Sequence, residues 1–346
     1  MNKFKTILQC AVFIFLSACS DSNEANRPHE VLFQGMTMGT VSYNVKVIVK
    51  PDSLPGSKFD QQKAHKDIDA ILEQLLQDMS NWEANSELTR FNKSTSLVPI
   101  EISEGLRRVL AESIRLGKLS EGKLDVTIGP LINLWGFGPD YRPERVPSES
   151  ELEIAKKRTG LKYLTLNGNK LSKDIPDLYV DLSTIAKGYA VDLIAEYFEN
   201  KGYHNYLVEI GGEMRLKGFK HTGELWHVAI EKPLSEERSV HQIIIPKDNA
   251  LATSGDYRKY FEANGQRFSH IIDPESGKPI NHKLVSVTVI HPSSMTADGL
   301  STAMMLMGED KALVFAEENE LAAYMIIKTD HGFVEQSTVK FMQYLK

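Results

Sequence analysis

Two segments of the sequence combine residue types that suit phosphate and metal chemistry. Residues 181–189 have the composition of a turn from a strand into a helix, and free N–H groups at a helix N-terminus favour a phosphate or another anion. Lys187 adds a positive charge in the first turn of that helix. Asp298 and Thr302 are four positions apart, so they share one helix face that suits a hard cation such as Mg²⁺. Helix capping is the alternative role for Asp181 and for Asp298.

Two other segments carry glycines beside groups that contact flat rings. Met38 lies between Gly35 and Gly39, where a ligand can approach the backbone and meet a polarizable sulfur; a turn before a strand is the alternative. Residues 122–139 mix glycine, proline and aromatic side chains, which predicts an irregular loop, either ordered around a ligand or packed on the surface. The GGE sequence at 211–213 is too short for a dinucleotide fingerprint. Together, the phosphate, cation and ring contacts indicate a nucleotide-like ligand with Mg²⁺.

The elements that must position these segments are helices together with strands whose spacing is typical of β-hairpins. The clearest helix covers residues 60–79, with one apolar stripe and Asp60 as its N-cap. Other helices are predicted at about 103–119, 148–160, 185–202, 295–307 and 310–318, and extended segments at 31–50, 178–182, 206–210, 226–231, 241–246, 268–272, 285–291 and 322–329. This order predicts an α+β fold with mixed, mostly antiparallel sheets and packed helices in a single unit of two lobes.

The composition is that of a packed globular protein. Of 346 residues, 42% are hydrophobic and 25% charged, which excludes disordered and fibrous classes. Forty Lys and Arg against 46 Asp and Glu give a formal charge of −6 without a basic block, so nucleic acid is not an expected partner.

The N-terminus has the pattern of an export signal. Lys3 and Lys5 precede an apolar stretch at 7–16, which is too short to span a membrane, and Leu-Ser-Ala then leads to Cys19. Small residues before a cysteine resemble the lipobox of bacterial lipoproteins; an ordinary signal peptide that contains a cysteine is the alternative. We expect a signal peptide at 1–18, a lipidated tether at 19–30 and one domain at 31–346.

Six motifs follow one another along the chain. They are Met38-Gly39-Thr40, GxxDxTxGPLxxLWGFG from Gly122 to Gly138, Asp181-Leu-Ser-x-x-x-Lys-Gly-Tyr, Thr253-Ser-Gly-Asp-Tyr, His270-Ile-Ile-Asp-Pro-x-x-Gly and Asp298-x-x-x-Thr302. In this combination the chain resembles the ApbE family, the FAD:protein FMN transferases, over essentially its whole mature length. The resemblance implies binding of FAD and Mg²⁺, cleavage of the pyrophosphate, and attachment of FMN through a phosphoester to a threonine of a partner protein, with release of AMP.

The same resemblance assigns site residues. It implies FAD contacts at Met38, Trp82, Lys123, Leu124, Asp125, Asp181, Lys187 and Ile272, and metal positions at Thr184, Asp298 and Thr302. Trp82 stands where the family commonly has a tyrosine against the isoalloxazine ring, so an aromatic face is kept. At Thr184 the ligand would be the backbone carbonyl. Ser301 replaces an aspartate of some members, which leaves one or two metal ions open.

The base that assists the incoming hydroxyl is the least determined role. His270 is our candidate, against a structural histidine at a strand edge and against Asp298 as the base. Two other functions stay open at this point: an FAD pyrophosphatase with water as nucleophile, and a flavin-binding lipoprotein without catalysis. The expected acceptors are proteins such as subunits of membrane redox complexes. The expected location is the periplasmic side of the bacterial inner membrane, held by a lipid on Cys19.

Overall fold

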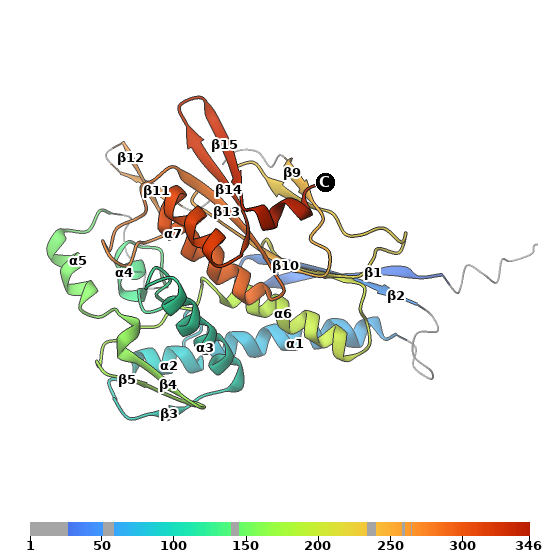
Figure 1. The fold of residues 1–346 in the computed structure, drawn as a ribbon. Helices are drawn as coiled ribbons and strands as arrows, with labels where there is room; N and C mark the ends of the chain where they lie inside the picture. Colours follow the sequence, from blue (N-terminus) through green and yellow to red (C-terminus); the bar gives the residue numbers. More distant parts are fainter. Residues whose placement is uncertain (1–26, 51–58, 140–144, 234–239, 258–259, 264) are drawn as a thin grey trace, which may run out of the picture.

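An eight-stranded antiparallel sheet forms the centre of the molecule (Figure 1). The computed structural model describes residues 27–50, 59–139, 145–233, 240–257, 260–263 and 265–346. The strand order is β1-β2-β6-β7-β10-β13-β14-β15. The bounds are β1 His29–Thr37, β2 Val41–Val49, β6 Tyr206–Ile210, β7 Glu213–Lys217, β10 Ala250–Gly255, β13 Leu284–His291, β14 Ala322–Thr329 and β15 Gly332–Ser337.

Helices cover one face of this sheet. The helices are α1 Gln61–Met79, α2 Glu87–Lys93, α3 Glu104–Leu119, α4 Gly129–Leu134, α5 Glu149–Lys156, α6 Ala186–Asn200 and α7 Ser294–Glu318. In the main core, α1, α6 and α7 pack against side chains that point from alternate sheet positions, such as Val287 and Val289 of β13, and α3 packs on α7 and α1. The expected α+β architecture is therefore confirmed.

The opposite face of the sheet is covered by smaller elements. The hairpin of β8 (Val228–Glu231) and β9 (Val240–Ile244), together with a 3₁₀ helix at Val339–Tyr344, packs there against the other set of alternate side chains, including Ile290. Because both faces are covered, β13 is buried along most of its length. A third core joins α4, α5 and the hairpin of β11 (Tyr260–Ala263) and β12 (Gln266–Ser269). A small sheet combines β3 (Ile100–Glu101), β5 (Lys170–Lys173) and β4 (Leu164–Asn167), with a 3₁₀ turn at Leu161–Tyr163.

Several helix starts follow the local signals in the sequence. Asp60 accepts a hydrogen bond from the Lys63 N–H at 2.9 Å and caps α1 as predicted. Ser148 and Glu151 form the capping box of α5, although that helix ends at Lys156 rather than at 160.

Other predictions need correction. The segment expected to be irregular contains α4, because Pro130 occupies the first turn, where its missing N–H costs no helical hydrogen bond. Residues 178–182 form no strand; they contribute a single bridge between Ile128 and Tyr179. The two expected C-terminal helices are continuous in α7 apart from Gly308, whose φ of 75° introduces a kink. β12 ends at Ser269, so the predicted strand at 268–272 is displaced.

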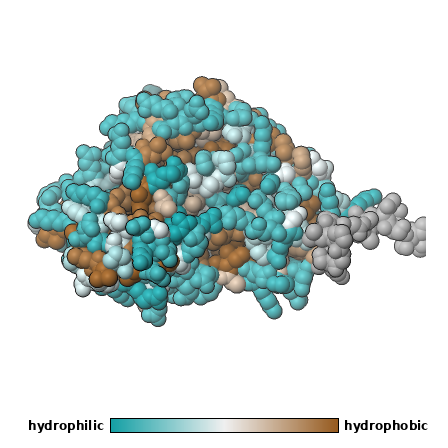
Figure 2. Space-filling model, turned by 60° about the horizontal axis from the view of Figure 1, so that its bottom comes forward, coloured by the Kyte–Doolittle hydropathy of each residue, from teal (hydrophilic) through white to brown (hydrophobic). Residues whose placement is uncertain are grey.

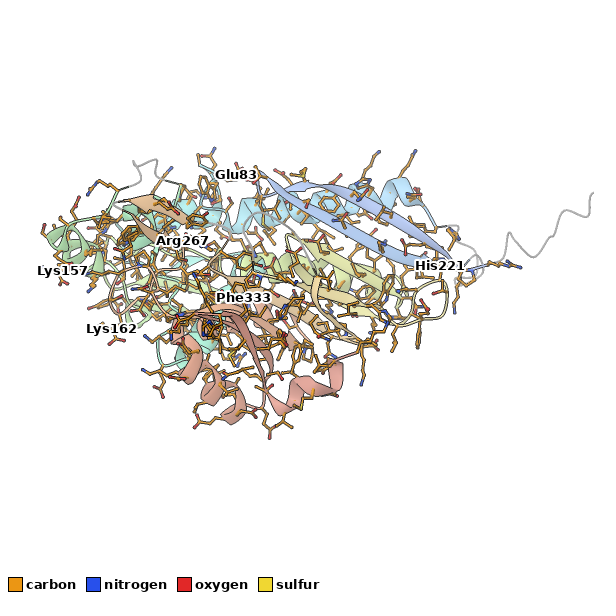
Figure 3. All side chains as sticks on the ribbon, turned by 90° about the horizontal axis from the view of Figure 1, so that it is seen from above. Glu83, Lys157, Lys162, His221, Arg267 and Phe333 are labelled. Atoms are coloured by element: carbon orange, nitrogen blue, oxygen red, sulfur yellow. The ribbon has the colours of Figure 1, made fainter. Side chains whose placement is uncertain are left out.

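The predicted signal peptide at 1–18 and Cys19 lie outside the described residues. Within the described residues, no helix has the length and apolar character needed to cross a membrane. Figure 2 shows one face that is mainly hydrophilic, with hydrophobic residues in scattered areas. In Figure 3, His221 lies at the end of the molecule where the described chain begins, and Lys157 lies at the opposite end.

Candidate active site

Asp298 lies buried in α7. The N-cap of α7 is Ser293, whose Oγ accepts from the Thr296 N–H at 3.2 Å, so Asp298 does not cap the helix. The residue is only 3% exposed. Burial raises the pKa of its carboxyl to about 7; the charge of Lys187 lowers this pKa, and the charge of Glu213 raises it. A buried carboxylate with a strongly raised pKa, which does not cap its own helix, indicates a functional role.

Thr302 lies one helical turn after Asp298, as the spacing predicted. Its Oγ1 is 3.1 Å from Ser254 Oγ of β10, and Ser254 Oγ is also 2.8 Å from Ser301 Oγ. The hydroxyls therefore form a connected group beside the Asp298 turn. Ser254 belongs to the Thr253-Ser-Gly-Asp-Tyr motif. The motif could have indicated this role, but the sequence analysis assigned none to Ser254.

The start of α6 meets α7 at this carboxylate. The Gly188 N–H donates to Asp298 Oδ2 at 3.0 Å. A Cβ on Gly188 would lie 2.3 Å from the Ser294 carbonyl oxygen, so only glycine permits this approach of the two helices. The N-cap of α6 is Ile185, which has no capping side chain, so the Asp298 carboxylate serves the first turn in its place. Asp181 instead accepts from the Ser183 N–H at 2.8 Å, so its predicted alternative role as the cap of this helix is wrong.

Lys187 of α6 forms an ion pair that the sequence did not predict. Its Nζ lies 2.5 Å from Glu213 Oε1. Glu213 follows the turn Gly211-Gly212 between β6 and β7, and the Gly211 N–H donates to the Ser42 carbonyl at 3.1 Å. These contacts place the GGE turn next to the start of β2, which follows the turn that contains Met38.

Met38 itself has the left-handed conformation, with φ of 48°, in the tight turn between β1 and β2. The predicted turn before a strand is confirmed. Contact of Met38 with FAD is a proposal, and the GGE turn lies near the same end of β2.

The residues present fit a hard cation. Thr184 Oγ1 is buried and, within the described part of the chain, has no hydrogen-bond partner. The Asp298 carboxylate and the Thr302 hydroxyl supply further oxygen atoms on the helix packed against this segment. No group of three or more His, Cys, Asp or Glu side chains in the described residues could hold a metal. A cation here would therefore use one carboxylate with hydroxyl, carbonyl and water oxygens, which is the set that suits Mg²⁺.

The remaining motifs adjoin this centre through backbone and ion-pair contacts. The Asp181 N–H donates to the Val126 carbonyl at 2.7 Å, which joins the 181–189 turn to the loop that starts at Gly122. Asn81 Nδ2 donates to the Val180 carbonyl at 3.2 Å, which joins the segment that contains Trp82 to the residue before Asp181. Lys123 Nζ lies 3.1 Å from Asp273 Oδ1 of the His270 motif.

The side chains of the implied FAD contacts differ in availability. Trp82 is 71% exposed, so its ring can receive a flat ligand. Leu124 and Ile272 are buried as whole residues, so the structure exposes almost no surface of either to a ligand. Burial raises the pKa of Asp125, which accepts from Thr127 Oγ1 at 2.6 Å and so orders its own loop. His270 is half-buried, with its ring centroid 6.3 Å from that of Phe137.

Residues 38–325 match the model of the ApbE family, and this match spans most of the chain and all of the segments just described. The chain belongs to the ApbE family. An FAD:protein FMN transferase from Vibrio cholerae is 49% identical over 339 residues, which cover 98% of each chain. One from Escherichia coli K12 is 37% identical over 99% of this chain and 97% of its own.

Solved ApbE structures have the same fold. The flavin transferase ApbE from Vibrio cholerae superposes with a TM-score of 0.85 at 50% identity, over 92% of this chain and 100% of its own. The apo form of the flavinyl transferase ApbE from Pseudomonas stutzeri gives a TM-score of 0.84 at 38% identity, over 92% of this chain and 98% of its own. The predicted resemblance to the ApbE family is therefore confirmed.

Proposed function

We propose that this protein transfers FMN from FAD to a threonine hydroxyl of a partner protein, in a reaction that depends on Mg²⁺ and releases AMP. The observation that carries the proposal is the meeting of the first turn of α6 with the buried Asp298 carboxylate, at Gly188 N–H to Asp298 Oδ2. A helix N-terminus suits the diphosphate, and the carboxylate suits the cation that accompanies it. The names of the relatives support transfer of FMN from FAD to a protein.

Each group has a separate task in this proposal. The Trp82 ring stacks on the isoalloxazine, and Lys187 with the first turn of α6 binds the diphosphate. Asp298, Thr302 and the Thr184 carbonyl would hold Mg²⁺, which when bound supplies charge neutralisation at the diphosphate and at the leaving AMP. These residues orient the FMN phosphorus for in-line attack, which accounts for much of the catalysis in phosphoryl-type transfer.

The chemical step exchanges the phosphoanhydride bond of FAD for a phosphoester bond to the acceptor. The acceptor Oγ forms a bond to the FMN phosphorus, the bond from that phosphorus to the bridging oxygen breaks, and AMP leaves with that oxygen. The proton of the acceptor hydroxyl passes to a base, for which His270 is the candidate and Asp298 the alternative.

The deciding experiment uses purified protein with FAD, Mg²⁺ and a candidate acceptor protein. We expect the acceptor to gain the mass of FMN less one water, with one AMP released for each acceptor labelled. Replacing the acceptor threonine with valine, which keeps the shape without the hydroxyl, should stop labelling. Equal amounts of free FMN and AMP with and without acceptor, with no labelled acceptor, would mean that the protein is an FAD pyrophosphatase.

We also propose that the protein is anchored by a lipid on Cys19 and faces the periplasm at the inner membrane. The support is the short apolar stretch followed by Leu-Ser-Ala-Cys19. Such a location would place the enzyme beside membrane redox complexes, whose subunits are the acceptors that we expect.

A further inference from the structure

The ion pair of Lys187 and Glu213 joins two elements next to Asp298. Lys187 Nζ lies 2.5 Å from Glu213 Oε1, and the two side chains are 29% and 4% exposed. Lys187 belongs to the first turn of α6, where the helix dipole disfavours a positive charge. The opposing carboxylate of β7 therefore contributes to holding the ammonium group at this position.

The turn before Glu213 confines the pair. Gly211 and Gly212 have φ of 61° and 108°, a backbone conformation that favours glycine. A Cβ on Gly211 would lie 2.7 Å from Val41 Cγ1 and 3.7 Å from both Glu213 Oε2 and Lys187 Cδ. The backbone of this turn therefore lies close to both members of the pair.

Two carboxylates lie within electrostatic reach of this one ammonium group. Asp298 Oδ2 accepts at 3.0 Å from the N–H of Gly188, the residue after Lys187, so this carboxylate lies beside the first turn of α6. The charges of Lys187 and Glu213 shift its pKa in opposite directions. In the proposed function the Asp298 carboxylate binds the cation. An ammonium group that paired with Asp298 would neutralise this carboxylate and compete with the cation for its oxygens. An ammonium group held by Glu213 leaves those oxygens to the cation.

The second carboxylate oxygen of Glu213 has an energetic cost of burial that a purely structural ion pair does not require. Glu213 Oε2 is buried and, among the described residues, has no hydrogen-bond partner. Leaving a buried acceptor unsatisfied is unfavourable, and such groups in native proteins call for an explanation. A ligand hydroxyl or a water brought in by a bound cation would satisfy this oxygen.

We propose that Glu213 is a positioning residue, which holds the Lys187 ammonium group away from Asp298 and so keeps the Asp298 carboxylate available to a divalent cation. This inference rests on the metal site of the proposed function. It adds a residue that acts on the cation through Lys187 and not by direct coordination.

The test measures binding of Mn²⁺ to the full chain without FAD, by electron paramagnetic resonance or calorimetry, so it does not depend on turnover. Glu213→Gln should weaken Mn²⁺ binding about tenfold, at the lower end of the effect of residues that support metal ligands. Adding Lys187→Met to Glu213→Gln should restore much of the affinity, because the competing ammonium group is then gone. Loss of fold or of packing would not be reversed in this way.

The matched control is Glu209→Gln on the same hairpin. Glu209 accepts from the Gly212 N–H at 2.8 Å and from Asn44 Nδ2 at 2.7 Å, and its substitution should leave Mn²⁺ affinity unchanged. If Glu213→Gln does not fold, Glu213→Asp replaces it; the shorter carboxylate should weaken binding, and Lys187→Met should again restore it.

The outcomes separate this inference from the proposed function. Wild-type affinity in Glu213→Gln, or no recovery in the double variant, would overturn the role of Glu213 while the metal site stands. Absence of Mn²⁺ binding by the wild type, or undiminished binding by Asp298→Asn, would overturn the metal site and this inference with it.

Discussion

The backbone N–H of Gly188 donates to Asp298 Oδ2 at 3.0 Å, so the first turn of α6 and the buried carboxylate of α7 fix each other. This contact requires the two helices to approach closely near their N-termini. Asp192 of α6 reinforces the approach, because its carboxylate accepts from the Ser294 and Met295 N–H groups at 3.0 Å each. The geometry of the candidate site is therefore set by the packing of α6 on α7.

Gly188→Ala should disturb this packing. The added Cβ would lie 2.3 Å from the Ser294 carbonyl oxygen, which is backbone and cannot move alone. We expect a loss of about 1–3 kcal/mol in the free energy of unfolding, measured by urea denaturation, together with weaker FAD binding. Gly105→Ala is the control, because its Cβ would clash only with the movable end of the Asp78 side chain and would meet the Tyr189 hydroxyl at an ordinary 3.7 Å. Equal stability of the two variants would contradict the close approach of α6 and α7.

Asp298→Ala should remove most catalytic activity. The substitution takes away the carboxylate proposed for the cation, and loss of several kcal/mol of charge stabilisation corresponds to roughly a thousandfold in turnover. FAD affinity should fall much less, because the ring and phosphate contacts remain. Asp310→Ala, at an exposed position of the same helix, should behave as wild type. Turnover of Asp298→Ala within a few-fold of wild type would move the metal site elsewhere.

Cation binding should weaken as the pH falls through about 7. Burial raises the pKa of Asp298 to about 7, so in the cation-free protein a proton occupies the carboxyl below this pH and must leave when the cation binds. Above this pH the carboxylate is ionised and no proton competes. We expect Mn²⁺ affinity to decrease about tenfold per pH unit below pH 7 and to level off above it. A flat profile from about pH 5.5 to 8 would contradict this origin of the dependence.

Trp82→Ala should weaken FAD binding without affecting the fold. The side chain is 71% exposed, so it contributes little to the core, whereas stacking on a flat ring contributes about 0.5–1.5 kcal/mol beyond buried area. We expect a several-fold increase in the dissociation constant by calorimetry and an unchanged melting temperature. Trp82→Tyr keeps an aromatic face and should bind nearly as well as wild type. Undiminished affinity in Trp82→Ala would exclude this ring from the FAD site.

Cys19→Ser should release the protein from membranes. The lipobox interpretation makes Cys19 the attachment point of the lipid, so the variant should lose lipid labelling and pass to the soluble fraction after cell lysis. Cys10→Ser is the control, because Cys10 lies in the predicted signal peptide and would be removed before the mature protein forms. Equal membrane association of Cys19→Ser and wild type would leave an ordinary signal peptide as the explanation.

Interactions between near neighbours in the sequence were predictable without the structure. Asp60 caps α1, and the strands at 206–210 and 322–329 have the predicted bounds. Thr302 follows Asp298 by one helical turn, because helical periodicity depends on local geometry alone. The six motifs and their order were also recognisable from the sequence, and together they carried the resemblance to the ApbE family.

The contacts that complete the site depend on residues distant in the chain. Glu213 meets Lys187 only because the register of β6 with β7 and the packing of α6 bring them together, and Ser254 meets Thr302 only because α7 lies on β10. A sequence pattern records which face of an element is apolar, but it does not record which element packs against that face. Helix crossing and strand order are fixed by burial of apolar surface over the whole domain, so only the tertiary structure could place these partners.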